Sequence, residues 1–268
     1  MYARATAIVI AALFCLAANA GQAADTAAAR LMNEAHHAFY YARDGAQAQI
    51  TMSSPGISGR FDEYKFWLIR RDSADLGDQR YLLCFFAPDS LARMTFLVHK
   101  KANGQDNRWQ YLPAADRVLR IPAANRRDSF LGMDFTHEDI SGRLPALDDH
   151  NIIGPDSTIR RPVTKVKSTP LDSTTADYAY RISWIDNQTK LPLKEEYFAQ
   201  DDKLVRIVEI GRIEIIEEIP TPMVLKVTDL RGPGLTTISI SEITYQTKLR
   251  PKDFNQELLK KPPAEFTK

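Results

Sequence analysis

Short segments in which apolar and polar residues alternate follow one another along most of the chain, and this pattern constrains the fold more than any other feature. Alternation with a period of two predicts strands that have one apolar face. Pro, Gly, Asn and Asp separate nearly all of these segments, as hairpin connections require, and long helices between neighbouring segments are missing. The sequence therefore predicts a mainly β chain with one large antiparallel sheet, with strands at residues 46–53, 61–70, 80–86, 94–100, 108–112, 116–121, 160–167, 177–185, 193–198, 203–217, 223–229 and 235–246.

Two stretches depart from this alternation. After Asp25 and Thr26, either of which can cap a helix, apolar residues recur at helical spacing as far as Tyr41. The adjacent His36 and His37 of this predicted helix point about 100° apart, so they are poorly placed to share a metal. Residues 126–140 do not alternate, and we expect short helical turns or a structured loop that lies across the sheet.

The first twenty residues have the pattern of a secretory signal peptide. Arg4 precedes an apolar run at residues 7–18, and Ala18-Asn19-Ala20 is a small-x-small cleavage site. The run is shorter than the roughly 20 apolar residues that cross a bilayer, which disfavours the alternative of a membrane anchor. We therefore expect residues 1–20 to be removed and residues 21–268 to form a single exported domain, soluble in the periplasm. Cleavage after Ala23 is a competing possibility, and lipidation at Cys15 is disfavoured because Phe14 precedes it.

Charge and cysteine content exclude several classes of protein. Lys and Arg total 35 against 34 for Asp and Glu, which is not the basic excess of a nucleic-acid binder. Beyond the predicted signal peptide the chain keeps only Cys84, so an internal disulfide is excluded. Cys84 lies in an apolar run, where a buried structural thiol is more common than a catalytic one.

Motifs of catalysis are missing from the sequence. It contains no Gly-x-Ser-x-Gly elbow, no phosphate-binding Gly-x-x-x-x-Gly-Lys loop and no His-Glu-x-x-His zinc helix. We therefore expect no enzymatic activity, no catalytic residue, no bound metal and no cofactor. A metal- or acid-dependent lipid hydrolase is the weakest of the functions considered.

Two clusters of charge have more than one interpretation. Asp134, His137, Glu138 and Asp139 would hold a metal or a general base, but a capped helix start, whose dipole favours acids, explains them better. A basic cluster would bind a phosphate headgroup or an acidic partner, or it consists of ordinary strand-edge charges. Its members are Arg117, Arg120, Arg126 and Arg127.

In several neighbouring strands, large apolar side chains stand at every second position, so those of one strand point to the same face of the sheet. The inside of a curved sheet requires such an apolar face. Such stripes belong either to a filled core or to the wall of a cavity. They comprise Tyr64, Phe66 and Leu68; Tyr81, Leu83 and Phe85; Met94, Phe96 and Val98; and Trp109 and Tyr111.

Ordered motifs in both halves of the chain resemble the outer-membrane lipoprotein-sorting protein family, relatives of the periplasmic lipoprotein carrier LolA. The first half carries them at residues 109–114, 117–121 and 130–140. The second half carries them at residues 184–186, 191–194, 197 and 201–205, and in Phe254, Leu258 and Leu259. His137 stands where an aromatic residue, commonly Tyr, is expected, and Asp202 replaces the Gly of an Asp-Gly-Lys hairpin.

The resemblance implies an unclosed, strongly curved antiparallel half-barrel whose mouth is covered by an N-terminal helix and short lid helices. It implies a periplasmic carrier that binds acyl chains of a lipid or lipoprotein in an apolar cavity and moves them between membranes. An inner-membrane exporter and an outer-membrane acceptor are the expected partners. The alternative is an accessory partner of such an exporter that carries no cargo itself.

The alternating apolar side chains and the family resemblance together predict a lipid-binding surface on the concave side of the sheet and in the lid. Arg126, Arg127, Glu138 and Asp139 are expected to stay in water at the rim of the lid. The predicted lipid-binding residues are Phe66, Leu83, Phe85, Phe96, Trp109, Tyr111, Phe130, Leu131, Met133 and Phe135.

Overall fold

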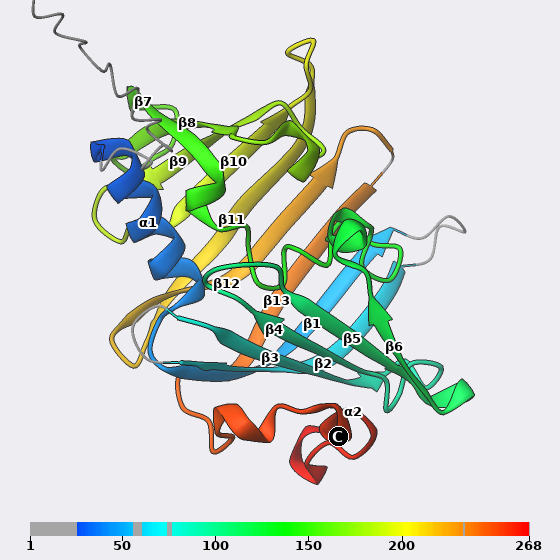
Figure 1. Cartoon of the computed structure of the whole chain (residues 1–268). Coiled ribbons are helices and arrows are strands. Elements are labelled where there is room, and N and C mark those ends of the chain that lie inside the picture. The colour runs from blue at the N-terminus through cyan, green and yellow to red at the C-terminus, as the bar shows by residue number, and fades with distance from the viewer. Residues whose placement is uncertain (1–25, 56–60, 74–76, 233, 268) are drawn as a thin grey trace, which may run out of the picture.

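The computed structural model describes residues 26–55, 61–73, 77–232 and 234–267, so the predicted signal peptide lies outside the described residues. Two α-helices and a long series of strands make up this part of the chain (Figure 1). The helices are α1 (Ala27–Tyr40) and α2 (Gln256–Lys260). The strands are β1 (Gly45–Pro55), β2 (Phe61–Asp72), β3 (Gln79–Ala87), β4 (Thr95–Lys100), β5 (Asn107–Leu112), β6 (Arg117–Ile121), β7 (Asp148–Asp156), β8 (Val163–Pro170), β9 (Tyr180–Asp186), β10 (Pro192–Phe198), β11 (Leu204–Ile216), β12 (Ile219–Asp229) and β13 (Gly234–Thr244).

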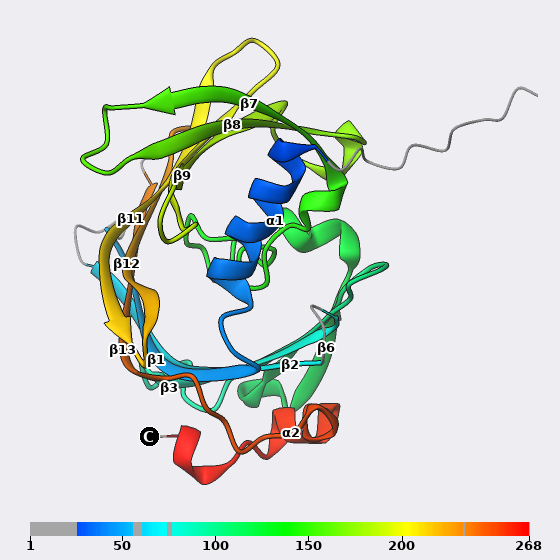
Figure 2. The same ribbon diagram turned by 90° about the vertical axis from the view of Figure 1, so that its left-hand side faces the viewer.

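All of these strands belong to one 13-stranded sheet. Its order is β6-β5-β4-β3-β2-β1-β13-β12-β11-β10-β9-β8-β7, and every neighbouring pair is antiparallel. The sheet curves strongly around α1, while its edge strands β6 and β7 do not pair with each other (Figure 2). The predicted unclosed antiparallel half-barrel is therefore confirmed.

Each predicted strand overlaps a strand of the structure, but β7 was not among the predicted strands. This strand contains Asp148, Asp149 and Asn151, and it is interrupted by Gly154 and Pro155, all residues that are rare in strands. It lies at the edge of the sheet, where most of its side chains are at least partly exposed. The alternation that marks a half-buried strand is consequently absent from it.

Helix α1 confirms the predicted N-terminal helix and fills part of the concave side. The backbone N–H of Ala29 donates to the Thr26 hydroxyl at 3.0 Å, so Thr26 is the N-cap. Met32 and Ala35 lie on the buried face of the helix and pack with Val166 and Ile185 of the sheet.

The connection between β6 and β7, residues 122–147, joins the two free edges of the sheet, and we call it the crossover segment. It must cross the open side of the half-barrel, because its ends lie at opposite edges. The part at residues 126–140 is irregular, as predicted, with a 3-10 turn at Ala123–Arg127 and a single β-bridge between Ser129 and Thr136. No α-helix begins at residues 134–139, so the favoured interpretation of their acids as a capped helix start is wrong.

The C-terminal segment covers the opposite, convex face of the sheet (Figure 2). Phe254, Leu259 and Phe266 pack there with Leu82 and Cys84 of β3. Burial raises the pKa of the Cys84 thiol to about 12, so this cysteine is a structural thiol, as the sequence predicted. None of the helices in the described part of the chain is both long and apolar enough to cross a membrane.

Candidate functional site

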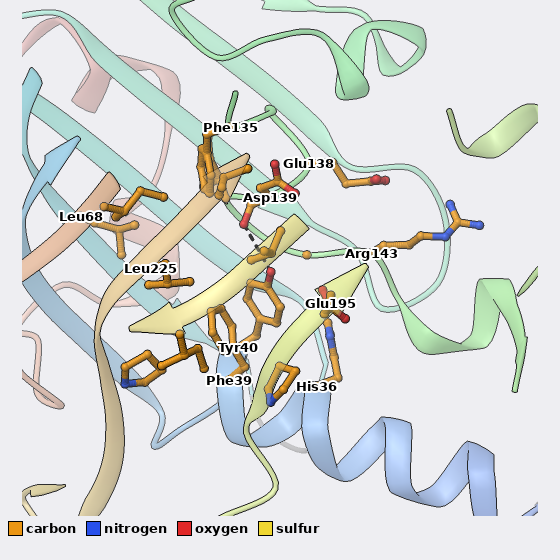
Figure 3. A pocket seen from close by; sticks show the side chains of 18 of the residues that line it. His36, Phe39, Tyr40, Leu68, Phe135, Glu138, Asp139, Arg143, Glu195 and Leu225 are labelled. Atoms are coloured by element: carbon orange, nitrogen blue, oxygen red, sulfur yellow. Dashed lines mark hydrogen bonds between the residues drawn. The ribbon is translucent and has the colours of Figure 1, made fainter. Parts of the chain in front are cut away.

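A cavity of about 240 Å³ lies on the concave face, between the sheet, α1 and the crossover segment (Figure 3). Much of its wall is apolar. Ala48 and Ile50 of β1, Leu225 of β12 and Ile238 of β13 form part of the sheet side, and Phe39 closes the cavity from α1. A dry apolar cavity of about 150 Å³ is large enough for benzene in other proteins, so this one accommodates part of a longer hydrocarbon chain.

Three of the predicted lipid-binding residues line this cavity, namely Phe66, Leu83 and Phe135. Four others are buried beside it in the same apolar cluster rather than in its wall: Phe85, Phe96, Phe130 and Met133. Leu131 is partly buried and packs against that cluster.

Phe130 fastens the crossover segment to the sheet. Its side chain is 1% exposed, and its ring centroid lies 5.3 Å from that of Phe96 and 6.1 Å from that of Phe85. His137, at the position where the family resemblance leads to an aromatic residue, stacks on Phe96 with ring centroids 5.4 Å apart. The crossover segment is thus held over the concave face by aromatic packing.

The prediction that Trp109 and Tyr111 face the concave side is wrong. In the β4–β5 register Trp109 lies opposite Leu97, and directly opposed residues of an antiparallel pair point to the same face. Leu97 belongs to the cluster on the convex face, and both aromatic residues join it there, beneath the C-terminal segment. Residues of β5 on the concave side are instead Gln110, whose side chain contacts Met94, and Leu112.

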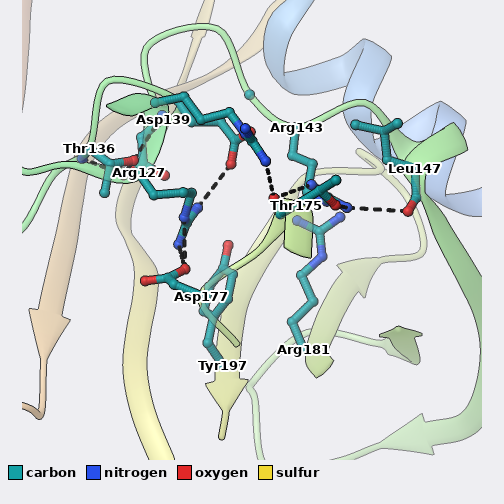
Figure 4. Close-up of polar contacts among 12 residues, drawn as sticks. Arg127, Thr136, Asp139, Arg143, Leu147, Thr175, Asp177, Arg181 and Tyr197 are labelled. Carbon is teal, nitrogen blue, oxygen red and sulfur yellow. Dashed lines mark hydrogen bonds and ion pairs between the residues drawn. The ribbon is translucent and has the colours of Figure 1, made fainter. Parts of the chain in front are cut away.

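One end of the cavity is polar, a feature that the sequence did not indicate (Figure 4). Arginines and acids of the crossover segment and of β9–β11 meet there in pairs. Arg206 of β11 donates to Asp139 of the crossover segment, with 2.5 Å between Nη2 and Oδ2. Burial alone would raise the pKa of the Asp139 carboxyl, but Arg206 and Arg127 outweigh it and lower that pKa below its usual value.

Arg127 connects two carboxylates at this end of the cavity. Its guanidinium lies 3.0 Å from Glu138 Oε2 and 2.5 Å from Asp177 Oδ1. Arg126 contacts the other oxygen of Glu138 at 3.3 Å. The expectation that these side chains stay in water at the rim is therefore wrong, because Glu138 is buried and Arg127, Arg126 and Asp139 are half-buried in ion pairs that compensate for lost hydration.

A second chain of contacts continues to β9 and β10. Arg143 Nε lies 2.8 Å from Asp148 Oδ1, and Arg181 lies 3.6 Å from both Asp148 and Glu195. The Tyr197 hydroxyl donates to Glu195 at 2.8 Å. A buried polar network therefore links the crossover segment to the sheet.

Lys100 of β4 connects the crossover segment to α1. Its ammonium donates to the carbonyl oxygens of Ser141 and Gly142 and lies 3.2 Å from His36 Nε2. Burial lowers the pKa of Lys100 to about 8, and burial next to Lys100 lowers the pKa of His36 well below its usual value. At neutral pH a charged lysine therefore donates to a neutral histidine.

The acid cluster and the basic cluster of the sequence both separate in the structure. Asp134 bonds Thr236 of β13, whereas Glu138 and Asp139 bind different arginines. Arg117 and Arg120 are exposed on the edge strand β6, away from the buried Arg127 network. Among the described residues, no group of three or more His, Cys, Asp or Glu side chains could hold a metal ion.

The positions of Arg181 and Arg206 within their strands could have indicated that they point inward. Every second side chain of a strand points to the same face, and Arg206 stands two positions before Val208, which lines the cavity. Arg181 has the parity of Ile185, which packs against α1. A buried arginine at an inward position can be recognised in this way once the inward parity of its strand is known.

Comparison with known proteins identifies the family and the fold. A family model described as "Uncharacterized protein" matches residues 77–261. No protein of curated function gives a significant match.

Solved structures of three bacterial proteins share the fold. A domain from Vibrio parahaemolyticus described as an outer membrane lipoprotein-sorting protein is 22% identical, with a TM-score of 0.79, over 87% of this chain and 98% of that one. A DUF1329 family protein from Desulfovibrio piger is 23% identical, with a TM-score of 0.78, over 86% and 97%. A LolA superfamily protein from Nitrosomonas europaea is 14% identical, with a TM-score of 0.65, over 87% and 99%.

Proposed function

Because the chain belongs to the family whose model matches residues 77–261, and has the fold of lipoprotein-sorting and LolA superfamily proteins, we propose that it is a carrier of acyl chains. The observation that carries this proposal is the cavity of about 240 Å³ on the concave face. The cavity wall formed by β1, β12 and β13 is apolar, as the binding of a hydrocarbon chain requires.

The energetics favour such a ligand. Each buried methylene contributes about 0.8 kcal/mol, so a chain segment of several carbons gains several kcal/mol before ordering costs are subtracted. Ile50, Leu225 and Ile238 offer non-directional contact, which suits a chain that must enter and leave.

The crossover segment is the part of the wall that would move to admit the chain. Phe135 and Ile140 of this segment line the cavity, and Phe130 is buried beside them. Displacing the segment would expose the apolar wall to a donor or acceptor membrane component. In this proposal the predicted signal peptide directs the protein to the periplasm, where it moves a lipid or lipoprotein from an inner-membrane exporter to an outer-membrane acceptor.

Binding of a dansyl-labelled fatty acid to the purified protein tests the proposal. Ala48→Phe places a ring in the cavity from β1, and we expect it to weaken binding at least tenfold, because the chain loses its space. The matched control is Ala114→Phe, at an exposed position of a 3-10 turn, which should bind like the wild type.

If the wild-type protein does not bind the probe, the proposal that it carries acyl chains is wrong. Such a result would favour the alternative of an accessory partner that docks on an exporter without carrying cargo. Equal affinity in wild type and a folded Ala48→Phe variant would show that the probe binds elsewhere.

A further inference from the structure

Three residues of the cavity wall each carry a buried hydrogen-bond donor that lacks a partner among the residues that the structure describes. The donors are Tyr178 Oη, Arg181 Nε and Arg206 Nε. Their residues are only 5%, 8% and 2% exposed. A buried donor without a partner costs free energy, so a wall that keeps three of them is suited to a ligand that supplies acceptors.

The three residues that carry these donors all lie next to Tyr197, at the polar end of the cavity. The rings of Tyr178 and Tyr197 meet edge to face with centroids 4.9 Å apart. Arg206 lies over the Tyr197 ring at 5.3 Å. Arg181 forms an ion pair with Glu195, which accepts a hydrogen bond from the Tyr197 hydroxyl. Burial raises the pKa of Tyr178 to about 12, so its hydroxyl keeps its proton and remains able to donate at neutral pH.

The charges of this region are already paired. Arg206 has Asp139, Arg127 has Glu138 and Asp177, and Arg143 has Asp148. Arg181 lies 3.6 Å from both Asp148 and Glu195. A carboxylate or phosphate entering between these residues would add a buried negative charge beside arginines that already have carboxylate partners, which is costly. A neutral oxygen with two lone pairs accepts from the donors without that cost.

We infer that the polar end of the cavity binds the neutral carbonyl oxygen of an ester or amide at the head of the acyl chain, held by Tyr178, Arg181 and Arg206. The inference rests on the proposed function and adds the chemistry of the headgroup to it. It also gives the chain a direction in the cavity, with its carbonyl toward β9–β11 and its methylenes along β1, β12 and β13.

Displacement of the dansyl-labelled fatty acid by four ligands of matched chain length tests this inference. They are methyl laurate, N-methyl lauramide, laurate and dodecane. We expect the ester or the amide to bind about tenfold more tightly than dodecane, as one neutral hydrogen bond or two would give. Which of the two binds better distinguishes an ester-linked from an amide-linked source. Laurate is expected to bind more weakly than the better neutral ligand.

Tyr178→Phe removes one donor with little change of shape. We expect it to weaken ester or amide binding about three- to tenfold and to leave dodecane unchanged. The matched control is Tyr180→Phe, whose hydroxyl donates to Asp202 outside the cavity at 2.9 Å. In infrared spectra, the carbonyl band of the labelled ester bound to the wild type should lie at lower frequency than that of the ester bound to Tyr178→Phe, and the band in Tyr180→Phe should match the wild type.

Two results would overturn the inference while leaving the carrier intact. One is dodecane binding as tightly as the neutral carbonyl ligands, and the other is laurate binding more tightly than both. A Tyr178→Phe variant that weakens all four ligands equally would assign this residue a structural role. Failure of every ligand, dodecane included, to displace or bind would instead reject the proposed carrier itself.

Discussion

Arg206 of β11 and Asp139 of the crossover segment form an ion pair, with 2.5 Å between the nitrogen and the oxygen and side chains that are 2% and 18% exposed. The two residues are separated by 67 positions in the sequence. Because one belongs to the sheet and the other to the segment that closes the cavity, the pair ties the lid of the half-barrel to its wall.

Loss of Arg206 should therefore destabilise the protein strongly. Arg206→Met leaves Asp139 buried without its main partner, and we expect the free energy of unfolding to fall by about 3–5 kcal/mol in urea titrations. The double variant Arg206→Met/Asp139→Leu should recover much of this loss, since it removes both charges. Arg231→Met breaks more exposed pairs with Asp177 and Asp229 and should cost about 1 kcal/mol or less. A similar cost for Arg206→Met and Arg231→Met would contradict a buried role for the first.

Gly142 allows the crossover segment to pass close to α1. Its φ is +74°, and a Cβ atom placed there would lie 2.5 Å from the ring of Tyr40. We expect Gly142→Ala to lower the free energy of unfolding by about 2–4 kcal/mol, from backbone strain and from this contact. Gly132→Ala is the matched control, because its φ is +79° but no atom lies within 4 Å of the added Cβ. Equal thermal shifts in the two variants would show that the Tyr40 contact is unimportant.

The buried Lys100 predicts a pH dependence of stability. Its pKa is lowered by burial to about 8 from the ordinary value of 10.5, so the folded state releases its proton before the unfolded state does. Between these two values the unfolded state binds more protons, and the contribution of Lys100 to stability rises with pH by up to about 3 kcal/mol. Below about pH 8 that contribution is constant.

Comparison with Lys100→Met isolates this effect from the other groups that titrate at high pH. The difference in unfolding free energy between wild type and variant should shift in favour of the wild type from pH 7 to pH 10. Cys84 acts in the opposite sense, because its raised pKa costs the folded state stability above about pH 9, but it is common to both proteins. A difference that does not change with pH would show that Lys100 titrates normally.

Phe130 and Phe135 should respond differently to substitution, although both were predicted to bind lipid. Phe130 is fully buried between Phe85 and Phe96, so Phe130→Ser should cost about 3–5 kcal/mol of stability. Phe135 lines the cavity and is partly exposed, so Phe135→Ser should weaken binding of the dansyl-labelled fatty acid with a smaller loss of stability. Unchanged binding in a folded Phe135→Ser protein would remove this residue from the proposed site.

The sequence predicted the sheet well because alternation is a local property. The helix capped by Thr26 and the irregular segment at residues 126–140 were recognisable for the same reason. The turn before β11 tolerates Asp202 in place of Gly because this residue adopts a left-handed φ of 58°. Asp is among the residues that do so at modest cost.

The alternation within β5 does not show which of its side chains face the concave side. It indicates that Trp109 and Tyr111 point to the same face of the sheet, but not which face that is. Only the pairing of Trp109 with Leu97, together with the C-terminal segment packed over Leu97, places them on the convex side. The apolar surface that attracts them comes from residues more than a hundred positions away.

The polar end of the cavity could not be predicted from the sequence, for a related reason. Asp139 was expected to face solvent because its partner Arg206 is 67 positions away in the sequence. Glu138 pairs with Arg126 and Arg127 of its own segment, but the alternation pattern does not show that this segment is buried over the sheet. Arg206 reaches Asp139 only after the crossover segment has spanned the open side of the sheet. Burial of these charges is a property of the assembled half-barrel rather than of any segment.

Native mass spectrometry of the wild-type protein and the Ala48→Phe variant, both purified from a bacterial periplasm, tests the central proposal most directly. We expect the wild type to retain a copurified lipid, whose added mass contains an acyl chain, and the folded variant to have lost it. A wild-type protein of unliganded mass under gentle ionisation, or a variant that keeps the same lipid, would contradict the binding of acyl chains in this cavity.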